Sequence, residues 1–284
     1  MRMLIVGCLF VAMLVVLPAT AQEVSDTQFF PVVARLAGVA PSQWVTDLVV
    51  CNINDYSIEI GLEFFEEEVS HGIGDLDFSV RRTLGPLETQ LYEDVLSTLF
   101  GIEEDTKGAL IVTCANDFGL PNPDDADIIA TSRTYDVSSP LGGTAGQTVP
   151  SNGNMANFTG TQSVGTGARN DGSFRSNLGF VNSSLEDVTI HYRIWRSDGT
   201  VAAEGDIDMG PLSMVQRSFN SLGVGSVSGP LTVEAWLDPS DVSPDPCMDF
   251  ANSFFVYFSK ADRVSQDAEF SYLAPGEIPE CVDD

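Results

Sequence analysis

Few side chains in this sequence could serve as a general base, a zinc ligand or a Schiff-base nucleophile. Only two of the 284 residues are histidine, His71 and His191, and only two are lysine, Lys107 and Lys260. Most catalytic bases and zinc ligands are histidines, and Schiff bases require lysine. No Gly-x-Ser-x-Gly motif lies near either histidine, so a serine-hydrolase site is not indicated. We therefore expect a protein that is not an enzyme.

Carboxylates, in contrast, are abundant, and the formal net charge is −28. Such a charge repels polyphosphate, which excludes nucleic acid as a partner. Two acidic runs, Glu66–Glu68 and Glu103–Asp105, are typical of solvated faces, because an acid/base pair needs two different environments. A carboxylate-based hydrolase is kept as an alternative, and it would require a cleft that contains two acids of unequal pKa.

Two acidic, proline-containing loops are candidates for a hard cation. Ca²⁺ takes about six to eight oxygen ligands from carboxylates, carbonyls and water. Neither loop has the EF-hand spacing, and the prolines favour extended, solvated loops, so a calcium site and plain acidic loops both remain open. No cofactor other than Ca²⁺ is indicated. The candidate metal ligands are Asp117, Asp124, Asp125 and Asp127 in the first loop and Asp238, Asp241, Asp245 and Asp249 in the second.

Aromatic side chains offer a third kind of binding chemistry. Trp44, Trp195 and Trp236, together with Tyr192 and Tyr257, could stack on the apolar face of a sugar ring. The competing interpretation is core packing, which we favour for Trp44 because it aligns with Phe174 in the repeat described next.

The elements that carry these residues form a twofold repeat. Short β-rich segments are separated by Gly, Pro, Asn and Asp turns, which predicts antiparallel sheets packed as sandwiches. One helix is expected at Glu93–Phe100, ended by Gly101. Five blocks recur in the same order: Trp44–Asn52 with Phe174–Asn182, Ile58–Phe65 with Val188–Trp195, Leu84–Leu87 with Met209–Leu212, Gly108–Cys114 with Gly229–Ala235, and Ile128–Thr134 with Phe254–Lys260.

The N-terminus has the pattern of a secretory signal peptide. Arg2 gives a positive start, Leu4–Leu17 is an apolar run, and Ala19-Thr20-Ala21 is a small-residue cleavage site. The run is too short to span a membrane, and no later segment approaches that length. We expect a secreted mature chain with no membrane span. The predicted organisation is a signal peptide over 1–21, a first repeat over 22–150, a Gly/Ser/Asn-rich linker or long loop over 151–172, a second repeat over 173–275 and an acidic tail over 276–284.

Four cysteines remain after signal-peptide removal, an even number for an oxidising compartment. Cys51 and Cys114 occupy repeat positions that hold Val181 and Ala235 in the second copy. Because both of those residues are small and apolar, we expect two buried positions that face each other. The repeat therefore predicts one disulfide between Cys51 and Cys114, which leaves Cys247 and Cys281 to form a second.

These motifs together resemble a family. An aromatic-x-[Ser/Thr]-[Asp/Asn]-Leu strand, a Gly-Pro turn, Ser132–Tyr135 and then Gly143–Pro150 look like uncharacterised secreted bacterial proteins built from tandem immunoglobulin-like β-sandwich repeats. The ending Ser259–Asp267 followed by Tyr272–Pro275 is similar to their closing repeat. The resemblance covers residues 29–275. It implies an all-β fold of two tandem immunoglobulin-like sandwich domains with a short helix in the first, and it brings no catalytic residues.

From these observations we expect a secreted, non-enzymatic binding or structural module at the cell surface or in the extracellular space. Its partner would be an extracellular protein or glycan that the sequence does not identify. A calcium-dependent carbohydrate-binding or adhesion module is the first alternative, and the carboxylate-based hydrolase is the second.

Overall fold

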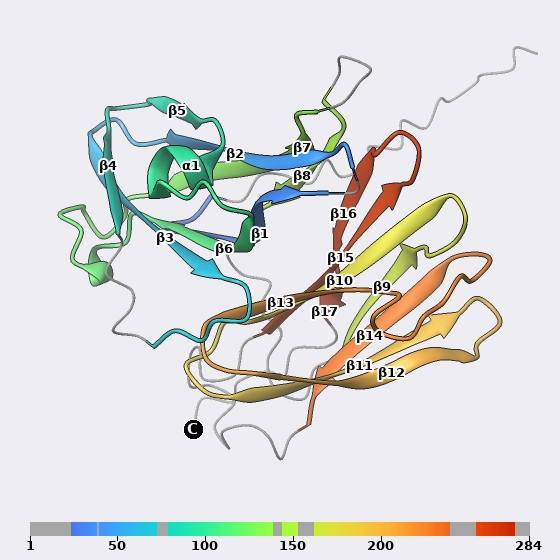
Figure 1. Cartoon of the computed structure of the whole chain (residues 1–284). Helices are drawn as coiled ribbons and strands as arrows, with labels where there is room; N and C mark the ends of the chain where they lie inside the picture. Colours follow the sequence, from blue (N-terminus) through green and yellow to red (C-terminus); the bar gives the residue numbers. More distant parts are fainter. Residues whose placement is uncertain are drawn as a thin grey trace, which may run out of the picture.

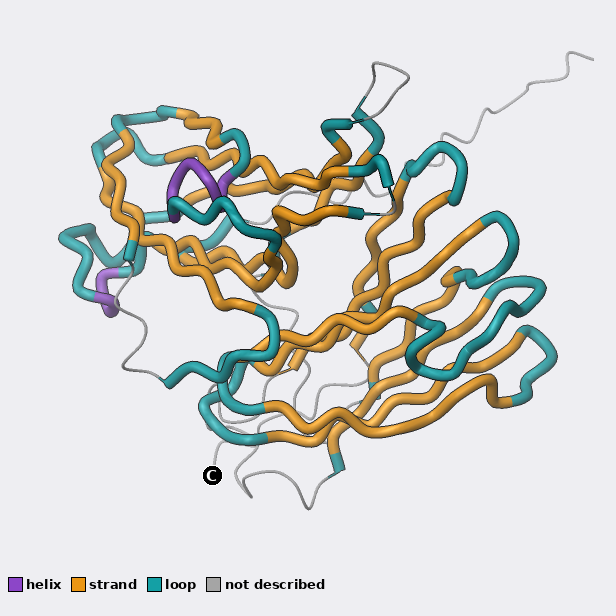
Figure 2. The backbone as a smooth tube through the Cα atoms, viewed as in Figure 1, coloured by secondary structure: helices purple, strands orange, loops and turns teal. Residues whose placement is uncertain are grey.

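The structure is a computed structural model that describes residues 24–38, 40–72, 79–138, 144–152, 162–238 and 254–275. The described chain is almost entirely β-strand, and all of its strand pairs are antiparallel. The all-β fold expected from the sequence is therefore present (Figures 1 and 2). Among the described residues there is no helix of the length and apolarity needed to cross a membrane.

The first half of the chain forms one continuous sheet that folds around its own core. β3 pairs with β4 and β6, and β2 pairs with β5 and β7. β1 joins the two groups, because it pairs along most of its length with β6 and at its last two residues with β2. The strands are β1 (Thr27–Ala37), β2 (Gln43–Asn52), β3 (Ile58–Glu66), β4 (Val80–Leu84), β5 (Thr89–Tyr92), β6 (Thr106–Thr113), β7 (Ile128–Asp136) and β8 (Gly146–Pro150).

The second half repeats this pairing pattern. β11 pairs with β12 and β14, and β14 pairs with β9, as β3, β4, β6 and β1 pair in the first half. β10 pairs with β13 and β15, and β15 pairs with β16. Here the strands form two separate sheets. They are β9 (Ser163–Ala168), β10 (Phe174–Asn182), β11 (Val188–Arg196), β12 (Val201–Met209), β13 (Ser213–Ser218), β14 (Leu231–Leu237), β15 (Phe254–Asp262), β16 (Ala268–Tyr272) and β17 (Ala274–Pro275).

A buried asparagine closes the same corner in both halves. The Nδ2 atom of Asn52, at the end of β2, donates to the carbonyls of Tyr56 and Gly85, both at 2.8 Å. Asn182, at the end of β10, donates in the same way to Glu186 at 2.7 Å and Gly210 at 2.8 Å. Each amide thereby links the end of its strand to two carbonyls of the following turns.

The turn fixed by each asparagine also has the same backbone conformation in both halves. Leu87 and Leu212 follow the Gly-Pro pairs and have φ values of 54° and 44°. This left-handed conformation is costly for leucine, and it occurs at equivalent positions. The repeated motif found in the sequence therefore corresponds to a repeated structural corner.

One short α-helix, α1 (Val95–Phe100), lies where the sequence predicts it and ends at Gly101. Val95 and Leu96 are fully buried in the core of the first half, and Leu99 and Phe100 pack against the same core. The helix therefore covers one side of the folded sheet (Figure 1).

The stretch 151–172, predicted as a linker or long loop, contains β9. Ser163 and Ala168, the two ends of this strand, are fully buried. Core side chains cover Gly165 in this strand: a Cβ there would lie 3.1 Å from Leu273 and 3.2 Å from Phe258. A strand can pair through its backbone without large apolar side chains, and a composition-based reading cannot detect this.

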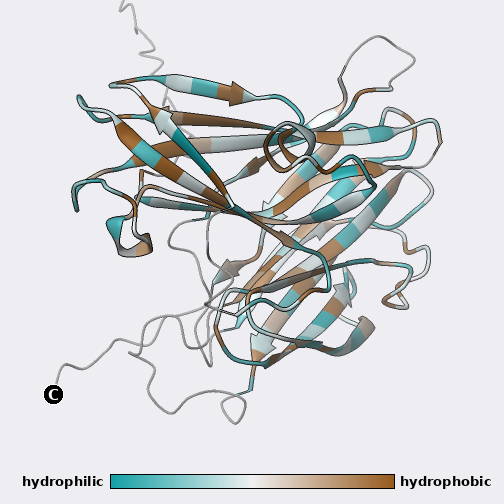
Figure 3. Cartoon of the chain, turned by 60° about the vertical axis from the view of Figure 1, so that its left-hand side comes forward, coloured by the Kyte–Doolittle hydropathy of each residue, from teal (hydrophilic) through white to brown (hydrophobic). Residues whose placement is uncertain are grey.

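Alternating residues build a core inside each half (Figure 3). Along β11, Val188, Ile190, Tyr192 and Ile194 are buried, whereas the residues between them face outward. Fully burying one such side chain stabilises the fold by about 1.5–3 kcal/mol.

A third apolar cluster joins the two halves. The outer face of β1, β3 and β6 packs on the outer face of β10, β13 and β15, and the rings of Phe29 and Phe255 stack with centroids 5.3 Å apart. At its border, Lys107 Nζ lies 3.2 Å from Glu67 and 3.1 Å from Gln216 Oε1. The buried members of this interface cluster are Val32, Phe65, Ala109 and Val149 from the first half and Val181, Met214, Phe255 and Tyr257 from the second.

Candidate functional site

A cleft of about 250 Å³ lies between the two halves, next to the interface cluster. On the side of the first half, β1 forms much of its surface. On the side of the second half, the surface is the outer face of β10, β13, β15 and β16. The polar and aromatic side chains that line it are Trp44, Lys107, Thr134 and Gln147 from the first half and Arg175, Asn177, Gln216 and Ser259 from the second.

The cleft exists because the outer face of the second half changes in character along its strands. On β15, the outward-facing positions are Phe255 and Tyr257 at the interface cluster and then Ser259 and Ala261 at the cleft. Large rings fill the space between the halves at one end, whereas small side chains leave it open at the other.

Arg175 is the most unusual group in the cleft. It is half-buried, and one terminal nitrogen donates to Gln266 Oε1 at 2.7 Å. Burial, and then the nearby positive charge of Arg263, lower the pKa of Arg175 below its usual value. Among the described residues no carboxylate pairs with it. In a chain with a net charge of −28, this guanidinium is a local positive site with N–H donors to spare.

The other polar groups are held in place by the fold. Asn177 Nδ2 donates to Ser259 Oγ at 3.4 Å. The charge of Lys107 is balanced by Glu67. The Oε1 atom of Gln147 is buried and has no hydrogen-bond partner within the described residues. The cleft is thus lined by one cation without a carboxylate partner in the described chain, by an amide with a buried oxygen that lacks a hydrogen bond, and by the indole of Trp44, an arrangement suited to binding a small polar ligand.

Trp44 keeps its place because residue 38 is glycine. A Cβ at Gly38 would lie 2.5 Å from Trp44 Nε1, so a larger residue would displace the indole. Trp44 therefore borders the cleft, and it does not fill the core position that alignment with Phe174 predicts.

The outer face of β11 and β14 carries a second group of polar and aromatic side chains. His191 lies 2.6 Å from Asp206 and 3.3 Å from Asp238, and it stacks on Trp236. The guanidinium of Arg193 lies 5.3 Å from the ring centre of Trp195, whose Nε1 donates to Glu234. Cross-strand pairs of this kind contribute about 0.2–1 kcal/mol each. They are sufficient to explain this face as the solvated side of a sheet.

The five aromatic residues considered from the sequence do not form one platform. Trp195 and Trp236 lie on the outer face of β11 and β14, and Trp44 lies in the cleft. Tyr192 is in the core of the second half, and Tyr257 is fully buried at the interface cluster, where burial raises its pKa.

The candidate calcium ligands are only partly described. Asp124 accepts a hydrogen bond from Asn116, and Asp125 accepts one from the Tyr56 hydroxyl at 3.3 Å. The backbone carbonyl of Asp127 accepts from Asn54 Nδ2 at 2.8 Å. Asp117 lies in a short 3₁₀-helix (Asn116–Phe118), and Asp238 contacts His191.

The remaining candidates, Asp241, Asp245 and Asp249, lie outside the described residues. Within the described part of the chain, no group of three or more His, Cys, Asp or Glu side chains could hold a metal ion. The calcium site stays a prediction.

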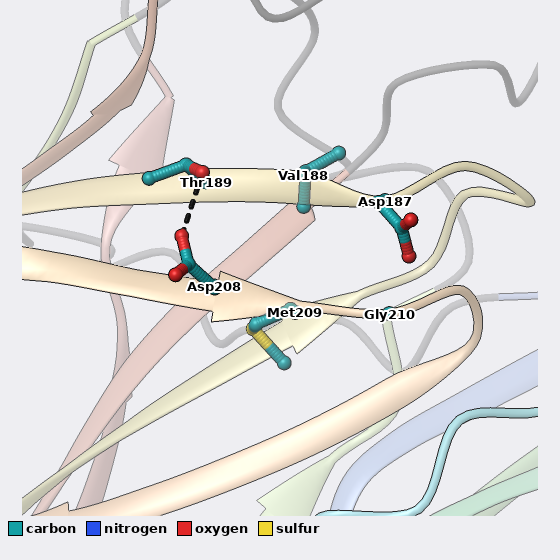
Figure 4. A pocket seen from close by; sticks show the side chains of 6 residues that line it. All are labelled: Asp187, Val188, Thr189, Asp208, Met209 and Gly210. Carbon is teal, nitrogen blue, oxygen red and sulfur yellow. Dashed lines mark hydrogen bonds between the residues drawn. The ribbon is translucent and has the colours of Figure 1, made fainter.

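Two further carboxylates line a surface pocket (Figure 4). It lies where β11 begins and β12 ends, and it is lined by Asp187, Asp208 and Thr189 among others. Thr189 Oγ1 donates to Asp208 at 2.8 Å. The pocket is open to solvent, and its acids therefore lack the enclosed setting that general acid catalysis uses.

The two acidic runs serve the structure in part. Glu67 and Glu68, expected on a solvated face, contact the second half: Glu67 Oε1 accepts from the backbone N–H of Gln216 at 2.8 Å, and Glu68 pairs with Arg217. Glu103 pairs with Arg35 at 2.9 Å. These acids hold elements together, a role that the sequence pattern does not reveal.

The predicted Cys51–Cys114 disulfide is not formed, and both thiols are free. The prediction is wrong because of strand parity. Cys114 is buried in the core of the first half, whereas Cys51 alternates with the core residues Leu48 and Val50 and so faces the other side of its sheet. The repeat shows the same parity, since Val181 lies in the interface cluster and Ala235 in the core of the second half. Cys247 and Cys281 lie outside the described residues.

We expect thiol labelling of the native protein to modify Cys51 and to spare Cys114. Burial raises the pKa of Cys114 to about 12, and the thiolate is the reactive form. Peptide mapping after alkylation without reductant measures both sites, with Cys51→Ser as the control. If both cysteines resisted alkylation until a reductant was added, the result would support the predicted Cys51–Cys114 disulfide and contradict the free thiols.

No family model matches the chain, and no curated protein matches it. Among solved structures, Bacteroides uniformis β-glucuronidase 2 with a covalently bound cyclophellitol-6-carboxylate aziridine has 13% identity and a TM-score of 0.16 over 87% of this chain and 26% of that chain. A second crystal structure of a B. uniformis β-glucuronidase has 12% identity and a TM-score of 0.18 over the same shares of the two chains.

A calcium-binding mutant of B. uniformis β-glucuronidase 2 has 10% identity and a TM-score of 0.16. This chain spans about a quarter of the length of these structures. TM-scores this low do not establish a shared fold.

Proposed function

We propose that this chain is a secreted, non-enzymatic binding module of two tandem immunoglobulin-like β-sandwich units, and that it takes its ligand in the cleft between them. The recurrence of one strand-pairing pattern in β1–β8 and β9–β16 supports the tandem architecture. The sequence pattern at residues 1–21 supports secretion, and that segment lies outside the described residues.

The observation that carries the binding role is the cleft itself. Ligand sites form preferentially at the junction of two domains, with a few polar groups set among apolar and aromatic walls. Trp44 and Arg175 come from different halves and line one cavity, and the interface cluster fixes the halves on either side of it. The ligand is therefore a small molecule or one residue of an extracellular glycan or protein chain.

A variant that fills the cleft tests this proposal. Ala261 lines the cleft on β15, and Ala261→Trp places a large ring there. Binding to arrays of extracellular glycans and proteins is measured for the unmodified mature chain and for this variant. We expect the variant to lose binding by at least about tenfold.

Thr232→Trp is the matched control, because Thr232 lies on β14 opposite Trp195 and its variant alters the outer face while leaving the cleft unchanged. A ligand whose binding is lost in Thr232→Trp and kept in Ala261→Trp would place the binding surface on β11 and β14 and contradict the proposal.

A further inference from the structure

We infer that the ligand in the cleft is a sugar acid whose carboxylate is bound by Arg175. This inference rests on the proposed function, because it names the ligand class of the same cleft. It is carried by three side chains that line this cleft, those of Arg175, Gln147 and Trp44.

Arg175 defines the anionic part of the ligand. Its known partner is the neutral amide oxygen of Gln266, at 2.7 Å. A half-buried guanidinium without a carboxylate partner in the described chain is stabilised by an anion, and its planar fork matches a carboxylate through two parallel hydrogen bonds. Lys107, whose charge is balanced by Glu67 at 3.2 Å, does not compete for this role.

Gln147 and Trp44 define the rest of the ligand. The buried Oε1 atom of Gln147 has no donor among the described residues, and a hydroxyl group supplies one. An indole offers a flat apolar surface on which a sugar ring stacks. The volume of about 250 Å³ is below the roughly 300–1,000 Å³ typical of sites for drug-sized molecules, so the cleft accommodates about one ring.

Because the whole chain is strongly negative, a carboxylate ligand can be attracted only at short range, by Arg175. A chain with a net charge of −28 repels anions at long range, so a bound carboxylate must be recognised by a specific nearby cation. Added salt screens both the repulsion and the attraction, and we therefore expect a weaker salt dependence than a cationic protein shows.

Galacturonate and galactose form the test pair, since they share one ring and differ in the presence of a carboxylate. Trp44 reports binding by fluorescence once Trp195→Phe and Trp236→Phe make it the single tryptophan. We expect galacturonate to bind at least about tenfold more tightly than galactose, and Arg175→Ala to lower its affinity by about 10- to 100-fold. Gln147→Leu, on the other half, weakens both sugars equally.

Arg82→Ala is the charge-matched control, because Arg82 is exposed and does not line the cleft. Equal loss in Arg82→Ala and Arg175→Ala would assign the effect to bulk charge and overturn the inference. Equal affinity for both sugars, abolished by Ala261→Trp, would overturn it and leave the cleft as the binding site. If neither sugar changed the fluorescence while Ala261→Trp still abolished binding of a ligand found on the arrays, the sugar-acid inference would be rejected and the cleft would remain the binding site.

Discussion

Replacing Tyr257 with alanine is expected to lower the free energy of unfolding by about 3–5 kcal/mol, the usual cost of removing a buried aromatic ring. Tyr257 is fully buried in the interface cluster and stacks on Phe270 with ring centroids 4.9 Å apart. Its ring covers Gly179 so closely that a Cβ there would lie 2.0 Å from the ring. Because glycine has no side chain, residue 179 cannot fill the space that the Tyr257→Ala substitution leaves. Chemical denaturation measures the loss.

Tyr257→Phe is the matched control for this variant. It removes only the hydroxyl, which accepts a hydrogen bond from Gln216 Nε2 at 3.3 Å, and it should cost about 0.5–1.5 kcal/mol. If Tyr257→Ala cost no more than Tyr257→Phe, the two halves would not be packed together in solution, and the cleft between them would lose its structural basis.

The second large effect is expected at the two buried asparagines. Asn52→Ala and Asn182→Ala each remove the two short hydrogen bonds that Nδ2 donates within the corner, and a hydrogen bond of this kind contributes about 0.5–1.5 kcal/mol. The same amide oxygens also accept the backbone N–H of Asn54 and Ser184, both at 2.9 Å. We therefore expect a loss of about 3 kcal/mol for either variant, measured as a shift of the denaturation midpoint.

Asn177→Ala is the control for the asparagine variants. Asn177 is also on β10, but its side chain makes one long hydrogen bond, of 3.4 Å to Ser259, so its removal should cost less than about 1 kcal/mol. Similar losses in all three variants would mean that the asparagines contribute strand propensity and do not hold the corner closed.

Much of the strand pattern could be predicted from residue alternation. The prediction failed where a tertiary contact determines the local structure. The helix was expected to begin at Glu93, yet it begins at Val95. Asp94 adopts a left-handed φ of 45°, and its backbone N–H donates to Asp47 Oδ1 at 2.9 Å. A contact with β2 therefore sets the start of this helix, and local sequence does not encode it.

The repeat alignment was correct in order but not in register for one block. The sequence pairs Leu110 with Leu231, whereas cross-strand partners make Leu110 equivalent to Val233, since these residues lie opposite Phe64 and Ile194 respectively. A slip of two residues preserves which face is buried, so the hydrophobic pattern cannot reveal it. The error over Cys51 has a related origin, because burial alone does not say which face of the sheet a residue lies on.

The cleft was not found from the sequence because its residues are scattered. Arg175 and Gln147 have no motif around them, and they line one cleft only because β8 and β10 come together in the folded chain. One signal was present in the sequence: Arg175 is the single charged residue on β10.

The contact between the two halves is not symmetric, and this determines how many units can associate through it. The first half uses the outer face of β3 and β6, where Ile111 lies opposite Glu63. On the matching face of the second half, Glu234 lies opposite Arg193. A head-to-tail contact of this kind would build an open array if it recurred.

Docking a third unit in the same way would bury Arg193 and Glu234, whose charged groups lie 4.0 Å apart, at a large desolvation cost. The charged outer face of β11 and β14 thus has the same role as the polar outer face of a capping repeat at the end of a repeat array. If several copies of this sequence were joined in tandem, the two halves within each copy would pack together, but successive copies would not pack against one another through this face.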